Sequence, residues 1–287
     1  MKLHFGMAQW QHPAWTGWLY SANGASNRRL QEYSMLFNTV EVGSSFYTDL
    51  TDQQITNWYQ QVPEYFRFSF KIPQTITHQL TTNTLLKSCE MLEKFCQQLQ
   101  PFTAKLGVTM MQFPATVTVE SLPLIERLCQ TWSLPTPLSI EVRHLSFFDK
   151  KDNESSFLSM LASHQKNRVI MDSRPVFSTA AYCDSLIDAQ KKKPKVPCHP
   201  ILTSNHPVVR FIGHPDLSIN DKYLDQWANK LVEWMQAGAE PYVFVHSSDN
   251  IAAPLLAVEL EKRVAALCLD YLPWLVIPPP QQQASLL

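Results

Sequence analysis

Glycine is scarce in this chain. Only 7 of the 287 residues are glycine, about a third of the share that is usual in globular proteins. No two glycines stand two positions apart, and none has the spacing of a G-x-x-x-x-G-K loop. The glycine-rich loops that bind dinucleotides and nucleoside triphosphates are therefore excluded.

Other features that are rare or missing narrow the class of protein further. The six cysteines form no C-x-x-C pair, so we expect reduced, mostly buried thiols. The N-terminus lacks the apolar core of a signal peptide, and no run approaches the roughly 18 apolar residues of a membrane span. With 24 basic and 25 acidic side chains, the net charge of -1 gives no overall attraction to nucleic acid or anionic lipid. We expect a soluble, cytoplasmic protein with no membrane partner.

Short runs rich in Val, Ile, Phe and Met recur every 30 to 40 residues along the chain. This spacing is typical of repeated βαβ units, and the 3–4 residue apolar rhythm of 81–99 and 220–235 predicts intervening helices. The predicted strands are 3–9, 39–42, 66–72, 106–112, 138–143, 168–172, 207–212 and 242–246. Eight alternations without a change in composition predict one α/β domain, a TIM (β/α)8-type barrel over residues 1–275. A Pro/Gln-rich C-terminal tail at 276–287 follows, and an open doubly wound sheet is the alternative fold.

Polar side chains stand at the ends of these predicted strands. Residues i and i+2 of a strand share one face, and this alternation points a set of ionic side chains inward: Glu41, Lys71, Glu141, Arg143, Asp172, Arg174 and Arg210. Gln9, Gln112 and His246 end three further strands. Because an unpaired buried charge costs several kcal/mol, we expect these groups to converge at the carboxyl-end mouth of the barrel, where this fold places active sites. A purely structural ion network is the alternative.

The order and spacing of several segments resemble a known family. The matching pieces include Ala8-Gln9-Trp10, Ser44-Ser45-Phe46-Tyr47, Phe68-Ser69-Phe70-Lys71, Ile140-Glu141-Val142-Arg143-His144, Val169-Ile170-Met171-Asp172-Ser173-Arg174-Pro175 and Val245-His246-Ser247-Ser248-Asp249. Together they are similar to the YecE-like barrels, catalogued as domain of unknown function 72, over nearly the whole chain. The resemblance implies a TIM-barrel fold and specifies no reaction.

The charge of the predicted mouth indicates its ligand. The four basic side chains outnumber the three acidic ones, and the planar fork of arginine suits phosphate or carboxylate. We therefore expect a small anionic ligand. The predicted substrate-binding residues are Gln9, Trp10, Trp15, Tyr47, His78, Gln112, Arg143, Arg174, Arg210 and His246, with Trp10 and Trp15 covering a ring. The predicted catalytic residues are Glu41, Glu141 and Asp172, for proton transfer, and Lys71, which can act as an amine nucleophile if burial and neighbouring cations lower its pKa.

Two further patterns leave alternatives open. His78, His144, His214 and His246 follow strand ends and, with Asp172 and Glu41, offer ligands for zinc or manganese. No dense metal-binding motif is present, so we predict no metal, and the sequence leaves any cofactor open. The lysine run at 191–193, with Lys195, is interpreted as a solvated loop. The alternative is a positive field that attracts an anionic substrate or nucleic acid.

The leading hypothesis is an enzyme that acts on an anionic small molecule, a phosphorylated or carboxylated compound such as a sugar phosphate. A second hypothesis is a metal-dependent phosphoesterase acting on nucleic acid through His78, His246, Glu41 and Glu141. The third is a non-catalytic anion-binding protein. Nucleic acid is the less favoured partner.

Overall fold

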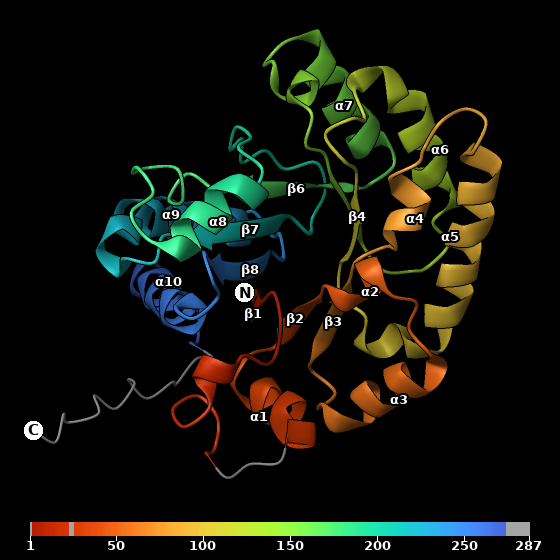
Figure 1. Ribbon diagram of the computed structural model, residues 1–287. Coiled ribbons are helices and arrows are strands. Elements are labelled where there is room, and N and C mark those ends of the chain that lie inside the picture. Colours follow the sequence, from red (N-terminus) through yellow and green to blue (C-terminus); the bar gives the residue numbers. More distant parts are fainter. Residues whose placement is uncertain (1, 23–25, 274–287) are drawn as a thin grey trace, which may run out of the picture.

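A computed structural model describes residues 2–22 and 26–273, so the tail predicted at 276–287 lies outside the described residues. Strands and helices alternate along the chain (Figure 1). All eight predicted strands are present, with ends that differ from the predicted ones by at most three residues. They are β1 (His4–Met7), β2 (Thr39–Val42), β3 (Arg67–Phe70), β4 (Thr109–Gln112), β5 (Leu138–Glu141), β6 (Asn167–Asp172), β7 (Val208–Gly213) and β8 (Tyr242–Ser247).

The helices follow the strands. They are α1 (Arg29–Leu36), α2 (Ser44–Tyr47), α3 (Asp52–Gln61), α4 (Gln74–Thr77), α5 (Leu85–Leu99), α6 (Leu122–Thr131), α7 (Asp152–Ser163), α8 (Asp184–Lys192), α9 (Asp221–Gln236) and α10 (Ala253–Leu267). The helices predicted at 81–99 and 220–235 are confirmed as α5 and α9. α5 begins later than predicted because Thr81 and Thr84 bond each other's backbone N–H groups in a turn. None of the helices in the described part has the length and apolar character needed to cross a membrane.

The strands form two parallel sheets. Six strands pair in the order β1-β8-β7-β6-β5-β4, and β2 pairs with β3. Single parallel bridges, Phe68 with Leu106 and Lys71 with Met110, link the β3 side to the β4 side. Within the described residues no backbone ladder joins β1 to β2. The predicted α/β class is confirmed. The prediction of a closed eight-stranded barrel is wrong, because among the described residues the strand pairing does not run continuously through all eight strands.

Side chains bridge the gap between β1 and β2. The Asn38 carboxamide accepts from Phe5 N at 2.7 Å and donates to Leu3 O at 2.9 Å. The Tyr33 hydroxyl accepts from Met7 N at 2.8 Å and donates to Thr39 O at 2.9 Å. These bonds satisfy backbone groups that a ladder would otherwise pair.

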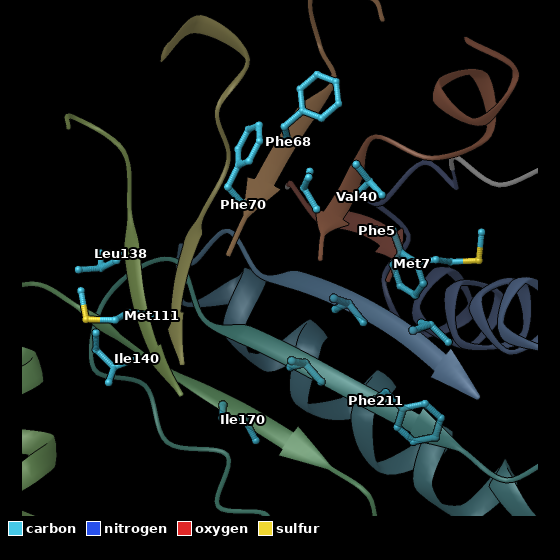
Figure 2. Close-up of a cluster of buried hydrophobic side chains, with 14 of the residues drawn as sticks. Phe5, Met7, Val40, Phe68, Phe70, Met111, Leu138, Ile140, Ile170 and Phe211 are labelled. Carbon is cyan, nitrogen blue, oxygen red and sulfur yellow. The ribbon is translucent and has the colours of Figure 1, made fainter. Parts of the chain in front are cut away.

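Apolar side chains pack on both faces of the strands. The larger core lies between the strands and the helices, and Figure 2 shows Phe70, Ile140, Ile170 and Phe211 pointing outward from the strands. A smaller inner core is formed by Val108, Met110, Val169, Val208, Tyr242 and Phe244. Strand alternation then fixes the polar positions. Arg210 shares the inner face with Val208, whereas Asp172 shares the outer face with Ile170.

The connection from β6 to β7 is unusual for an α/β unit. α8 packs Leu186 and Ala189 against the inner-face residues Met171 and Ile212. An extended segment, 193–207, then returns beside β6. The Ser173 hydroxyl donates to the carbonyl of Pro194 at 2.7 Å, and the Arg168 N–H donates to the Thr203 hydroxyl at 3.2 Å. β6 is thus contacted along its length by an extended chain.

The close approach of β1 and β2 gives a prediction for Gly6. A Cβ atom at this position would lie 2.0 Å from the carbonyl oxygen of Thr39. Gly6→Ala should therefore lower the free energy of unfolding by about 1–3 kcal/mol or more, as overpacking does, measured by urea denaturation. Gly43→Ala is the matched control, because the nearest atom to its added Cβ is 4.0 Å away. Equal stabilities of the two variants would contradict the close approach of β1 and β2 at Gly6.

Candidate functional site

A cavity of about 660 Å³ opens at the carboxyl ends of several strands. We call it the mouth pocket. Seven of the predicted site residues line it: Gln9, Trp10, Glu41, Tyr47, Lys71, Arg210 and His246. These residues come from β2, β7 and β8 and from the segments that follow β1, β2 and β3. The predicted convergence at the carboxyl-end mouth therefore holds for these seven residues.

Arg210 is the centre of a buried ion network beneath the pocket. Its Nε and Nη2 donate to the two carboxylate oxygens of Glu41 at 2.8 and 2.9 Å, and its Nη1 donates to Glu141 at 2.9 Å. Lys71 Nζ lies 2.9 Å from Glu41 and donates to Gln112 at 3.3 Å. Arg143 Nε donates to Glu141 at 2.9 Å. Three cations thus share two carboxylates.

The network holds both carboxylates in the charged form. Burial would raise the pKa of Glu41, but the charges of Arg210 and Lys71 hold it well below its usual range. Burial opposes ionisation of Glu141 in the same way, and Arg210 and Arg143 lower its pKa to about 2. Burial alone would lower the pKa of Arg210, but the two carboxylates outweigh this effect and raise the pKa above its usual value. Both glutamates are therefore poor proton acceptors at neutral pH.

Two pocket groups are shifted toward their neutral forms. Burial lowers the pKa of Lys71, the charge of Arg210 adds to the effect, and Glu41 opposes it. Burial lowers the pKa of His246 to about 4, so its imidazole is neutral at pH 7. His246 Nε2 lies 3.4 Å from Glu41 but makes no hydrogen bond to the described residues. The pocket therefore combines fixed charges with two groups whose charged forms are disfavoured by burial.

Among the lining residues that were not predicted, Lys193 and Trp58 matter most for the pocket. Lys193 directly follows α8 and lines the cavity. Burial and the nearby Arg210 lower its pKa. It belongs to the lysine run interpreted as a solvated loop, an interpretation that holds for the exposed Lys191 and Lys192 but not for Lys193. Trp58 of α3 also lines the pocket and meets Trp10 edge-on, with ring centroids 5.1 Å apart. No sequence pattern connected Trp58 to the mouth.

Asp172 and Arg174 lie outside the mouth pocket, contrary to the prediction. Asp172 is fully buried on the outer face of β6, where it accepts from Arg174 and from Trp227 of α9 at 2.8 Å each. Arg174 also lies over the ring of Tyr223 and borders a separate cavity of about 390 Å³ beside α9. These two residues pair with each other away from the mouth pocket, so their predicted place in it is wrong.

Trp15 is also misplaced by the prediction. Its side chain is fully buried, and its indole N–H donates to the carbonyls of Asn250 and Ile251 at 3.1 and 3.2 Å. It ties the segment after β1 to the segment after β8, and it is not a lining residue of the mouth pocket. His78 lies half-buried against Phe46, with ring centroids 5.2 Å apart, and is not a lining residue of the mouth pocket. Tyr47, by contrast, stands at the rim with 75% of its surface exposed.

The candidate metal ligands are dispersed. His144 accepts from the Ser146 N–H at 3.1 Å, and His214 accepts from the Asp216 N–H at 3.0 Å. Both oxygens of Glu41 are taken by Arg210 and Lys71. Across 2–22 and 26–273, no three His, Cys, Asp or Glu side chains gather in a way that would hold a metal ion. The ligand set of the phosphoesterase hypothesis is not assembled.

Comparison with known proteins identifies the family. Residues 4–279 match the family described as "Protein of unknown function DUF72". The chain belongs to this family. It is 34% identical over 255 residues to the UPF0759 protein YecE of Escherichia coli K12, covering 88% of this chain and 89% of that protein. It is also 30% identical over 157 residues to YunF of Bacillus subtilis, covering 51% and 55%.

Solved structures share the fold. A DUF72 family protein from Thermotoga maritima is 20% identical with a TM-score of 0.69, covering 91% of this chain and 98% of that one. A DUF72 family protein from Enterococcus faecalis gives 20% identity and a TM-score of 0.71, covering 91% and 95%. A sugar phosphate isomerase/epimerase from Parabacteroides distasonis gives 9% identity and a TM-score of 0.51, covering 89% and 95%. At these identities the likeness concerns the fold alone.

The buried network predicts a large effect of neutralising Glu41. Glu41→Gln should lower the free energy of unfolding by about 3–5 kcal/mol, because Arg210 and Lys71 would lose a buried counter-charge. The measurement is urea denaturation at pH 7.5. Glu64→Gln is the control, because Glu64 pairs with the buried Lys105 but is itself 86% exposed, and exposed partners contribute little. A loss at Glu41 no larger than at Glu64 would argue against the network.

His246 predicts a pH dependence of stability. Unfolded histidine takes up a proton near its ordinary pKa of 6.5, whereas folded His246 does so only at about 4. Stability should therefore fall as the pH drops from 6.5 to 4, by up to about 3 kcal/mol from this group. His246→Asn should flatten this part of the stability curve, measured by denaturation at several pH values. An unchanged slope would show that His246 is readily protonated in the fold.

Proposed function

We propose that this DUF72 protein is an enzyme whose mouth pocket binds a small anionic compound, phosphorylated or carboxylated. The supporting observation is the charge of the pocket. Lys71, Lys193 and Arg210 line it, and Glu41 is the one carboxylate among its described lining residues. A surplus of positive charge inside a partly dehydrated cavity attracts anions more strongly than the same charges do in water.

Lys193 is the cation best placed to meet the ligand. Arg210 uses its Nε, Nη1 and Nη2 on Glu41 and Glu141, and Lys71 contacts Glu41 and Gln112. Lys193 lines the same pocket from the position directly after α8, and it makes no ion pair with the described side chains. An anion between Lys193 and Lys71 would restore the counter-charge that Lys193 lacks, and this is the basis of the proposed binding mode.

The walls of the pocket support a ring-containing or sugar-like ligand. Trp10, Trp58 and Tyr47 line it, and aromatic faces pack well against the apolar faces of such compounds. The structural neighbour named as a sugar phosphate isomerase/epimerase acts on a compound of this class. By analogy with that fold, we interpret the eight strands as one TIM-type barrel whose β1–β2 seam is bridged by side chains. The mouth pocket then lies at the carboxyl ends of the strands, where TIM barrels usually have their active sites.

A non-catalytic anion-binding protein is the second candidate. It is favoured by the ion pairs that hold Glu41 and Glu141 ionised, since these carboxylates then serve structure more than proton transfer.

A cytoplasmic location is part of the proposal for either function. It rests on the six cysteines, which are all free thiols, as is usual in a reducing compartment.

The proposal predicts ligand-induced stabilisation that depends on Lys193. Phosphorylated sugars, nucleoside monophosphates and small carboxylates should be screened by thermal shift, and at least one should raise the Tm in a concentration-dependent way. Lys193→Gln should weaken that binding by about tenfold or more, because a charged hydrogen bond contributes about 1.5–3 kcal/mol. Lys192→Gln is the control, because Lys192 is exposed and pairs with Asp188. Equal losses in both variants, or no shift with any compound, would refute the binding mode.

A further inference from the structure

Lys71 is held rigidly at the inner edge of the mouth pocket. Its backbone N–H donates to the Ser45 hydroxyl at 3.1 Å, and that hydroxyl donates to the Lys71 carbonyl at 2.7 Å. A parallel bridge to Met110 fixes the other side of its backbone. The side chain is only 8% exposed, yet it lines the cavity. Its amine is therefore presented to the pocket from a fixed position.

The charges that face Lys71 disfavour its ammonium form. Arg210 binds the same carboxylate, Glu41, through two hydrogen bonds, and Lys193, directly after α8, adds positive charge. Glu41 and Glu141 are the carboxylates of this network. Because three network cations share two carboxylates, Lys71 is only partly compensated, and burial adds to the destabilisation of its charge. Such a setting activates a lysine amine as a nucleophile.

We propose that Lys71 is the catalytic amine of the mouth pocket and that the substrate is an anionic aldehyde or ketone, which Lys71 binds as a Schiff base. This inference rests on the proposed function and names its substrate class. In the step, the amine nitrogen forms a bond to the carbonyl carbon, and the C–O bond of the resulting carbinolamine breaks. The ammonium and the carbonyl compound become a protonated imine and one water molecule, with no net gain or loss of protons.

The neighbouring residues fit the charges of this step. Glu41 lies 2.9 Å from Lys71 Nζ and stays ionised as the counter-charge of that nitrogen, while the two protons that the ammonium loses pass to the carbonyl oxygen, which leaves as water. The protonated imine keeps its positive charge beside Glu41, and the ion network stays balanced. Acyl or phosphoryl transfer to Lys71 would remove that charge and leave Glu41 with one partner fewer, which favours a carbonyl substrate. Lys193 binds the anionic group.

Reductive trapping tests the proposal. The full-length protein is incubated with dihydroxyacetone phosphate, glyceraldehyde 3-phosphate or pyruvate, reduced with sodium borohydride, and examined by intact mass and peptide mapping. A single borohydride-dependent adduct on Lys71 is expected with at least one probe. Acetone is the matched neutral carbonyl, and it should label Lys71 at least tenfold less at equal concentration. No adduct with any probe, or adducts only on exposed lysines such as Lys191, would overturn the proposal.

Two variants control the trapping experiment. Lys71→Arg keeps the positive charge but has no amine, and it should lose the adduct. Lys105→Arg should keep it, because Lys105 is buried elsewhere, where its amine donates to the carbonyls of Tyr59 and Val62. Thermal shift with the same probes, without borohydride, separates the two proposals. Binding without an adduct overturns the Schiff base alone, whereas neither binding nor an adduct overturns the proposed function as well.

Discussion

The guanidinium of Arg210 joins carboxylates from strands that belong to different sheets. Arg210 lies on β7 and Glu141 at the end of β5, both in the six-stranded sheet, whereas Glu41 lies on β2 in the two-stranded sheet. Moving these charges out of water is costly, and the cost is offset only when all the partners are in place with good geometry. The position of β2 against the larger sheet is therefore coupled to the assembly of the pocket.

Strand alternation predicted much of this arrangement. Glu41 and Arg210 are each flanked by two apolar residues that pack outward, and His246 follows the outward-packed Val245; the structure places all three inward. The same rule failed at Asp172, because β6 carries charges on its outer face. Arg168 and Asp172 both point outward, and they are satisfied by Glu154 of α7 and by Trp227 of α9. The rule assumes that the apolar side chains of a helix cover the outer face of every strand. Beside β6, the extended segment 193–207 provides part of that cover instead of a helix.

The remaining errors arise from contacts between distant parts of the chain. Nothing near Lys193 in sequence distinguishes it from Lys192, and only the packing of α8 over Met171 and Ile212 brings its end to the pocket. The seam between β1 and β2 is likewise closed by the side chains of Asn38 and Tyr33, which a pattern of strand residues does not reveal. Local periodicity thus predicted the elements, whereas the way the sheets meet depends on individual side chains.

The same ion pairs that stabilise the fold limit the chemistry available at the mouth. Glu41 accepts two hydrogen bonds from Arg210, and Glu141 accepts one from Arg210 and one from Arg143, so both keep their charge and act mainly as fixed anions. Burial and neighbouring cations instead destabilise the charged forms of Lys71, Lys193 and His246 and lower their pKa values. Reactivity in this pocket therefore depends on incomplete compensation of positive charge. An anionic ligand would supply the counter-charge that Lys193 lacks among the described side chains.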